Sequence, residues 1–287
     1  MIKFGVSTFL WVSPFDTHSF HLVDKISMMG FDIIEIPVEK KELIDFQVLK
    51  EKIKVSDLKC TISGAFGSER DISSLDPKIR ANGLKYIKDC IEIAAYMDSP
   101  IFGGPLYSAV GKTRFISDDQ KKRERDFCIE NLRIASDFAK DNGIYLGLEP
   151  LNRFESDMVN TVDQALSLIQ EVASPNLKIQ LDTFHCNIEE KNIGNSIRKI
   201  GKDLICHIQG NESDRGTPGT GNLDWPDIVA ALHEIEYDGA VVIETFGAVS
   251  EEIANATCIW RPLANSSDEL AEEGLAFYKN IFKQKKG

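Results

Sequence analysis

The 287-residue sequence has no cysteine pair in a CxxC spacing, no apolar run of membrane-spanning length and no long basic segment. Its six cysteines are scattered singly, which argues against a zinc knuckle or a disulfide framework and favours reduced thiols in a core. Without a run of about 20 apolar residues, no transmembrane helix is expected. A net charge of −12 argues against binding to a phosphate backbone. No secretory signal precedes the first strand-like run, so we expect a cytoplasmic protein.

Nothing in the sequence is typical of a domain linker, a low-complexity segment or a close internal repeat. Instead, short apolar runs alternate with longer amphipathic segments. Eight runs have the character of strands: 2–9, 32–38, 60–66, 101–107, 145–151, 177–183, 205–211 and 240–246. Helix candidates, several of them opened by Asp, Ser or Thr, include 17–30, 41–55, 78–97, 118–142, 161–173 and 225–236. This alternation predicts an α/β fold with a single (β/α)8 TIM barrel over residues 1–287.

Polar side chains follow the apolar residues of four consecutive predicted strands, each before a predicted loop: Glu149, Asp182, Gln209 and Glu244. Active sites of (β/α)8 barrels lie at the C-terminal ends of the strands. Three carboxylates at one barrel mouth repel each other unless a cation holds them together. Oxygen ligands favour Mg²⁺ or Mn²⁺ over Zn²⁺, and Co²⁺ is a further candidate. We therefore expect one divalent ion at these four side chains. For any one acid, helix capping or pairing with a cation such as Arg153 stays open.

Five motifs in the sequence are specific in combination: LEPLNRFE, LDTFHCNIEE, NESDRGTPGTGNLDW, VVIETF and IWRPLAN. With them the chain resembles the ketose 3-epimerases of the D-tagatose/D-psicose 3-epimerase type, which belong to the xylose isomerase-like barrels. The resemblance extends from GVSTFLW near the start to the last helix. It implies a metal bound by Glu149, Asp182, Glu244 and a residue on the seventh strand. The substrate contacts that it implies are Glu155, His185 and Arg215. It also suggests a homodimer or homotetramer.

The seventh strand departs from the pattern of this family, which usually has His-x-His with the second His on the metal. This chain has His207-Ile208-Gln209 instead. Because side chains alternate along a strand, His207 and Gln209 point the same way, with Gln209 nearer the mouth. We expect the Gln209 amide oxygen to replace the imidazole, and His207 to support the site or to belong to the core. Barrels resembling hydroxypyruvate isomerases carry a similar His-Ile-Gln, which supports the replacement but weakens the assignment of the substrate.

These groups predict proton transfer next to the carbonyl of a free keto-sugar. A bound cation makes the C–H beside the carbonyl acidic, and loss of the proton gives an enediolate. Glu149 and Glu244 are the predicted catalytic bases: one removes the proton and the other returns it from the far face, which inverts the carbon. A single working base would instead make an aldose–ketose isomerase. Five aromatic residues near strand ends form either an apolar wall for the sugar or part of the core: Phe9, Trp11, Phe66, Tyr107 and Phe246.

Two other classes of function fit the sequence less well. Apurinic-site endonucleases share the barrel but need several His ligands and a basic surface, whereas this chain has five histidines and a net charge of −12. A non-catalytic sugar-binding or scaffolding barrel would not need both Glu149 and Glu244. We therefore expect a small sugar as the partner, and neither nucleic acid nor a membrane.

Overall fold

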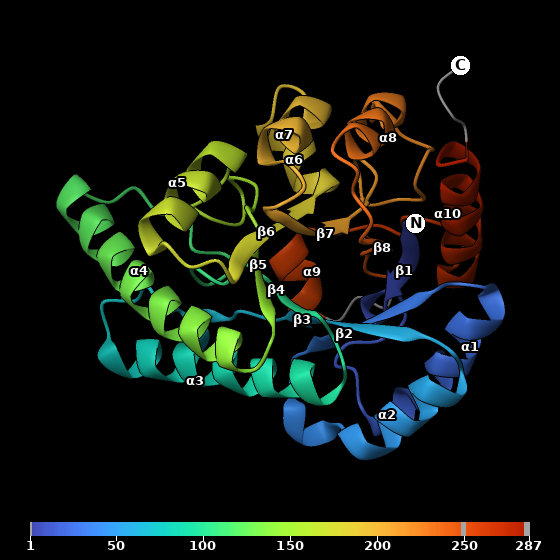
Figure 1. Cartoon of the computed structure of the whole chain (residues 1–287), viewed down its shortest axis with the longest axis horizontal. Coiled ribbons are helices and arrows are strands. Elements are labelled where there is room, and N and C mark those ends of the chain that lie inside the picture. The colour runs from blue at the N-terminus through green and yellow to red at the C-terminus, as the bar shows by residue number, and fades with distance from the viewer. Residues whose placement is uncertain (1, 248–250, 284–287) are drawn as a thin grey trace.

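The computed structural model describes residues 2–247 and 251–283, in which eight parallel strands close into a barrel (Figure 1). The strands are β1 (Lys3–Ser7), β2 (Ile33–Val38), β3 (Lys59–Gly64), β4 (Ile101–Gly104), β5 (Tyr145–Leu148), β6 (Leu177–Asp182), β7 (Ile205–Gln209) and β8 (Ala240–Ile243). Each strand pairs with the next one in sequence, and β8 closes the ring by pairing with β1. The predicted (β/α)8 barrel is confirmed.

Helices α1 to α8 connect successive strands around the outside of the barrel, and α9 and α10 follow β8 (Figure 1). Their bounds are α1 (His21–Met29), α2 (Phe46–Val55), α3 (Pro77–Tyr96), α4 (Asp118–Asp141), α5 (Val162–Val172), α6 (Thr183–Glu189), α7 (Ile193–Ile200), α8 (Trp225–Glu234), α9 (Glu251–Thr257) and α10 (Ser267–Ile281). Short 3-10 turns cover Thr8–Leu10, Thr17–Phe20, Lys41–Leu43 and Ser68–Arg70. The named helix candidates are confirmed to within a few residues, although two of them begin with 3-10 turns. The named ranges did not include α6, α7, α9 and α10; α6 and α7 span only 7 and 8 residues.

Several predicted strand runs extend past the point where the backbone leaves the sheet. The run 145–151 contains β5, which ends at Leu148, and the run 240–246 contains β8, which ends at Ile243. Glu149 and Glu244 therefore lie one residue beyond their strands. Asp182 and Gln209, in contrast, are the last residues of β6 and β7.

The core of the protein has an apolar part and a polar part. Apolar side chains of strands and helices form one large buried cluster between the barrel and its helices. Inside the barrel, Glu35 on β2 contacts both His207 and Gln209 on β7. Because β2 and β7 are not neighbours in the barrel, these side chains meet across its interior. The upper barrel interior is therefore a hydrogen-bonded polar layer.

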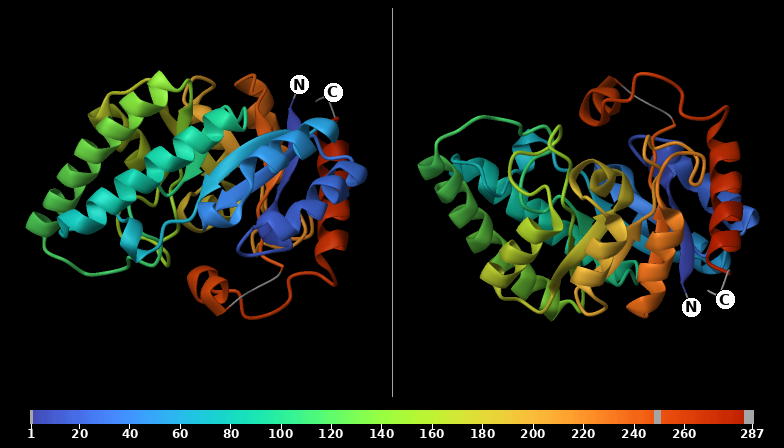
Figure 2. Two further views of the ribbon diagram at one scale, coloured as in Figure 1. Left: turned by 90° about the horizontal axis from the view of Figure 1, so that it is seen from below. Right: turned by 90° about the horizontal axis from the view of Figure 1, so that it is seen from above.

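Helix α9 lies over the mouth of the barrel into which the strand-end acids project. It is in the centre of the view in Figure 1 and stands apart from the ring of helices in both views of Figure 2. Its residues Ile253, Ala256 and Thr257 line the same cavity as Glu149 and Glu244. Within the described residues, we find no helix that is both long enough and apolar enough to cross a membrane.

A buried ionic network ties the loops after β4 and β5 to helix α4. The Nζ atom of Lys112 lies 2.7 Å from a carboxylate oxygen of Asp71 and 2.9 Å from one of Glu124. Arg114 lies 2.7 Å from Glu124 and 3.0 Å from Asp157. The side chains of Lys112, Asp71 and Glu124 are at most 9% exposed, so solvent screens these pairs only weakly. With Asp71 in the loop after β3, the network holds three loops of the barrel mouth in place.

We expect this network to make the fold sensitive to acid. Burial opposes the charge of Glu124, but hydrogen bonds from Arg114, Lys112 and Gln120 lower its pKa from 4.5 to about 2. A carboxylate with a lowered folded-state pKa stabilises the fold above its unfolded pKa, and this contribution is lost as the pH falls from 4.5 towards 2. Glu124→Gln should lower the free energy of unfolding at neutral pH by about 2 kcal/mol.

Urea denaturation over this pH range measures the effect. The loss of stability on acidification should be smaller in Glu124→Gln than in the wild type. Glu130→Gln, at an exposed position of the same helix, is the matched control and should change the free energy of unfolding by less than about 0.5 kcal/mol. Identical acid sensitivity in the wild type and Glu124→Gln would contradict the role assigned to the network.

Candidate active site at the barrel mouth

The predicted site residues meet around one cavity of about 550 Å³ at the C-terminal ends of the strands. Five of them line the cavity: Glu149, Glu155, His185, Arg215 and Glu244. The other two, Asp182 and Gln209, are 1% and 0% exposed and lie beneath the cavity, where Asp182 approaches His185 and Gln209 is hydrogen-bonded to Gln180. The structure therefore brings together all seven side chains chosen from the sequence.

Glu149, Asp182 and His185 form a buried cluster of potential metal ligands, with ligand atoms within 4.8 Å of one another. The Nε2 atom of His185 lies 3.6 Å from Glu149 Oε1 and 3.7 Å from Asp182 Oδ2. Asp182 was predicted to precede a loop, but it is instead the N-cap of α6. Its Oδ1 accepts the N–H of Phe184 at 2.7 Å. Its buried Oδ2 accepts no hydrogen bond from the described residues. Helix capping is thus correct for one oxygen of Asp182, and the other lies 3.2 Å from Nη1 of Arg215.

Arg215 brings a positive charge into the acid cluster from the loop after β7. Its Nη1 lies 3.2 Å from carboxylate oxygens of both Asp182 and Glu244. The guanidinium carbon lies 4.3 Å from the ring centre of Phe184 and 5.2 Å from that of Phe246. The backbone of Arg215 has φ 61°, a left-handed conformation that is strained for a residue with a side chain. Such strain at a buried, charged position is typical of functional sites.

Arg153, the surface cation considered as a partner for the strand-end acids, binds elsewhere. Its guanidinium lies 2.9 Å from Glu189, and its side chain is 62% exposed. It is Arg215 that pairs with the acids in the cavity.

The loop that carries Arg215 folds around the buried carboxylate of Glu212. The two oxygens of Glu212 accept hydrogen bonds from the N–H groups of Ser213, Gly219 and Leu223 and from the indole of Trp225. Burial works against the charge of Glu212, but these hydrogen bonds lower its pKa. The sequence analysis missed Glu212, because nothing local distinguishes an acid that its own loop will enclose from one that faces solvent.

The two predicted catalytic acids have strongly shifted pKa values. Burial raises the pKa of Glu149 well above its usual value, and the nearby charges of Glu244 and Asp182 raise it further. Burial also raises the pKa of Glu244 to about 8, although Arg215 acts in the opposite direction. Carboxylic acids whose pKa approaches the working pH are suited to accept and donate protons. A bound cation would oppose this shift by favouring the charged forms.

Asn152 connects two predicted substrate contacts, His185 and Glu155. Its backbone and side-chain nitrogens lie 3.2 and 2.8 Å from Nδ1 of His185, and its amide donates to Glu155 at 2.8 Å. The other ring nitrogen, Nε2, lies 3.2 Å from Nη2 of Arg215 and also faces the acid cluster. Burial lowers the pKa of His185, which favours the neutral ring. His185 therefore presents Nε2 to the cavity, where it can contact a sugar oxygen or a metal ion.

Gln209 belongs to a chain of hydrogen bonds across the barrel interior. Its Nε2 donates to Glu35 at 3.0 Å, and its Oε1 accepts a 3.0 Å hydrogen bond from Nε2 of Gln180. The same nitrogen of Gln180 donates to Glu149 at 3.0 Å. His207 lies one step deeper, 2.7 Å from Glu35. The sequence analysis missed Glu35 and Gln180. An acid inside the apolar run DIIEIPV and a glutamine inside LKIQLD were the available signals.

The residues of this site fit a divalent cation. Glu149 and Asp182 offer carboxylate oxygens and Gln209 an amide oxygen, which are the donors that Mg²⁺ and Mn²⁺ prefer. Oδ2 of Asp182 is buried and accepts no hydrogen bond from the described residues, although Nη1 of Arg215 lies 3.2 Å from it. Arg215 supplies one positive charge against four acids, Asp182, Glu244, Glu155 and Glu149.

The predicted aromatic wall is confirmed in part. Phe9, Phe66 and Phe246 line the cavity. Tyr107 is fully buried, with its hydroxyl donating to the carbonyl of Val159, and so belongs to the core. Trp11 is also absent from the cavity lining among the described residues, and its indole donates to Asp268. Three of the five aromatic residues are therefore placed to contact a ligand.

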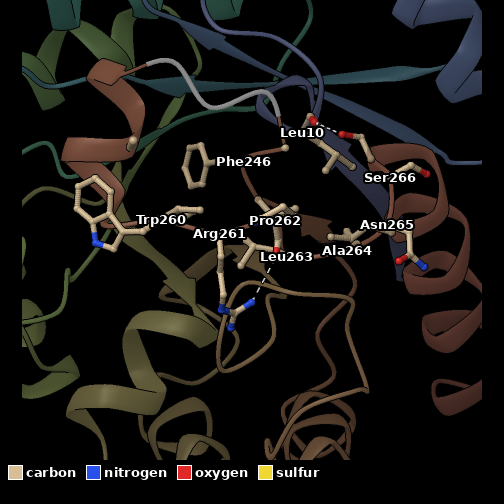
Figure 3. Close-up of a pocket in the computed structure, with 15 residues that line it drawn as sticks. Leu10, Phe246, Trp260, Arg261, Pro262, Leu263, Ala264, Asn265 and Ser266 are labelled. Atoms are coloured by element: carbon tan, nitrogen blue, oxygen red, sulfur yellow. Dashed lines mark hydrogen bonds between the residues drawn. The ribbon is translucent and has the colours of Figure 1, made fainter.

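A second cavity, of about 590 Å³, lies next to the first one along residues 259–267 (Figure 3). Trp260 and Arg261 line it, and Phe246 lines both cavities. Among the described residues, its lining includes none of the strand-end acids, so the acid–base groups belong to the first cavity.

Comparisons with known proteins identify the family. The sequence profile of the family described as "Xylose isomerase-like TIM barrel" matches residues 23–281. The D-psicose 3-epimerase of Enterocloster bolteae is 32% identical over 294 residues, which cover 98% of this chain and 96% of that protein. The L-ribulose 3-epimerase of Methylomonas sp. is 32% identical over 255 residues, or 88% of each chain. The crystal structure of a D-allulose 3-epimerase from Methylomonas sp. in complex with D-allulose has a TM-score of 0.91 at 29% identity, covering 98% of this chain and 97% of that one. The chain therefore belongs to the xylose isomerase-like TIM barrel family and, within it, to the ketose 3-epimerases, which are carbohydrate isomerases.

Proposed function

We propose that the protein is a metal-dependent 3-epimerase of free keto-sugars that acts through an enediolate. The observation that carries the proposal is that Glu149 and Glu244 line one cavity, with His185 and Arg215 beside them. The names of the relatives, D-psicose 3-epimerase and L-ribulose 3-epimerase, support this reaction and a ketose substrate. A cytoplasmic location and a homodimer or homotetramer stay predictions.

Glu149, Asp182, Gln209 and Glu244 are the proposed ligands of one divalent ion, Mn²⁺ or Mg²⁺. When bound, the ion supplies the positive charge that makes the C–H beside the sugar carbonyl acidic enough to lose its proton. Gln209 adds a neutral oxygen, so the ligand charge comes from the three carboxylates. Arg215 compensates part of that charge through its contacts with Asp182 and Glu244.

The positions of Glu149 and Glu244 suit proton transfer on two faces of a sugar. They follow β5 and β8, which are separated by β6 and β7 on one side of the barrel and by β1 to β4 on the other. One carboxylate accepts the proton of C3, and the other carboxylic acid donates a proton to the opposite face. The guanidinium of Arg215 is placed to donate hydrogen bonds to sugar oxygens, and Nε2 of His185 is placed to contact them. Glu155, held by Asn152, is placed to accept one from a hydroxyl.

The two arginines of the cavity favour a free sugar over a sugar phosphate, and the third cation in its lining, Lys40, is exposed. Arg215 is paired with Asp182 and Glu244. Arg70 donates to the backbone carbonyls of Ala65 and Glu39 at 2.7 Å each. These hydrogen bonds leave the two arginines with fewer donors for a phosphate group, which is typically bound by several at once.

Incubation in D₂O distinguishes the proposed epimerase from an isomerase. With Mn²⁺ and a panel of free ketoses, ketose phosphates and hydroxypyruvate, NMR should detect deuterium at C3 of an epimeric free ketose and none at C1. Glu149→Gln and Glu244→Gln should each lower kcat by about 10²- to 10⁴-fold, because each removes the proton carrier of one face. Bound metal is measured in the same samples, since each variant also changes a ligand. Deuterium at C1 together with an aldose product would reject the epimerase and favour the aldose–ketose isomerase.

Gln209→His tests the proposed amide ligand by restoring the residue usual in the family. Imidazole binds metal only when deprotonated, so this variant should lose metal on mild acidification more readily than the wild type does. It should also bind Co²⁺ or Zn²⁺ better relative to Mg²⁺. Calorimetric titrations with each ion near neutral pH and about one pH unit lower measure both effects. Gln209→Leu is the control and should weaken the binding of all of the ions. An unchanged order of ions and an unchanged pH dependence in Gln209→His would exclude Gln209 as a ligand.

A further inference from the structure

Gln180 lies at the centre of the polar layer inside the barrel and is 1% exposed. Its Nε2 donates two hydrogen bonds of 3.0 Å, one to Oε2 of Glu149 and one to Oε1 of Gln209. Gln180 is on β6, and its two partners come from the ends of the neighbouring strands β5 and β7. One amide nitrogen therefore connects two proposed metal ligands.

The surroundings of Gln180 are not those of an amide that is present for stability. Its own Oε1 is buried and accepts no hydrogen bond from the described residues. The side chain of Gln180 packs closely against two glycines. A Cβ atom added at Gly103 on β4 would lie 1.8 Å from this Oε1 atom, and one added at Gly147 on β5 would lie 3.1 Å from Cβ of Gln180. A buried acceptor without a donor is unfavourable, and an apolar side chain would avoid that cost. What the amide provides is its pair of donated hydrogen bonds.

The two ends of the Gln209 amide face unlike partners. Its Nε2 donates to Oε1 of Glu35, while Oε2 of Glu35 contacts Thr61 and His207 at 3.1 and 2.7 Å. Its Oε1 faces the N–H of Gln180. A flipped amide would place oxygen against the carboxylate of Glu35 and nitrogen against the nitrogen of Gln180, losing both hydrogen bonds. The amide oxygen is thus directed to the side of Glu149, and a carbonyl oxygen that accepts one hydrogen bond keeps a second lone pair.

We propose that Gln180 is a positioning residue of the metal site, which fixes the orientation of the Gln209 amide oxygen beside Glu149. This inference rests on the ligand role proposed above for Gln209. Hydrogen bonds that orient ligands are typically worth about 10- to 100-fold in metal affinity. Gln180 acts through Gln209 and does not touch the substrate.

Gln180→Met tests the inference, because it removes the donor and keeps a side chain of similar length. The Mn²⁺ affinity, measured from the electron paramagnetic resonance signal of free Mn²⁺, should fall about tenfold. The spectrum of bound Mn²⁺ should change as well, which a purely structural role would not cause. Asn131→Leu is the matched control: it removes a buried amide of α4 that donates to the carbonyls of Ile72 and Phe127. It should lower the melting temperature and leave the Mn²⁺ affinity unchanged.

Gln180→Met in a Gln209→Leu background distinguishes the positioning role of Gln180 from the ligand role of Gln209. If Gln180 acts through Gln209, adding Gln180→Met to Gln209→Leu should weaken Mn²⁺ binding by clearly less than about tenfold. An equal loss in both backgrounds would overturn the inference, because Gln180 would then act through Glu149 alone. Unchanged affinity in Gln180→Met with weaker binding in Gln209→Leu would overturn the inference and leave the ligand in place. Unchanged affinity in Gln209→Leu would overturn the ligand role itself and the inference with it.

Discussion

The burial of three carboxylates at one end of the barrel is the constraint on which the rest of the site depends. Glu149, Asp182 and Glu244 are each at most 8% exposed, and buried acids at close range repel each other unless opposite charge or hydrogen bonds compensate them. Arg215 provides part of the compensation, and its loop must fold around Glu212 to bring it there. The strained backbone of Arg215 is consistent with a position held by these contacts. The negative charge that Arg215 does not compensate favours a divalent cation at the site.

Burial of polar side chains continues below the carboxylates, in the polar layer inside the barrel. Barrel interiors are usually packed with branched apolar side chains, whereas here Glu35, Gln180, His207 and Gln209 occupy the level below the mouth. Their mutual hydrogen bonds make the burial of polar groups tolerable, and they also restrict the rotation of each side chain. The acids at the cavity and the amides beneath them are therefore oriented before a ligand arrives. Preorganised groups of this kind favour charge development without further rearrangement.

The cavity above the acids combines a polar floor with an apolar wall. Phe9, Phe66 and Phe246 supply flat apolar surfaces suited to the C–H face of a sugar, while His185 and Arg215 bring polar groups to the same cavity. Helix α9 adds Ile253 and Ala256 from above. Wherever such a wall excludes water, the electrostatic interactions among the acids below become stronger. The loops that form this wall belong to different βα units, so the shape of the substrate site is a property of the whole barrel.

The amino-acid sequence by itself determined the barrel and most of the site. The alternation of apolar runs with amphipathic segments is a local signal, and polar residues at the ends of parallel strands must meet at one mouth because the strands run in the same direction. The pairing of His207 and Gln209 on one face followed from the two-residue period of a strand. Only the tertiary structure decided the remainder. Glu35, Gln180 and Glu212 acquire their roles from partners across the barrel or around a loop, and Asp182 divides its two oxygens between capping α6 and pairing with Arg215. Such roles depend on which side chains approach each other in space, and these distances cannot be read from the spacing of residues along the chain.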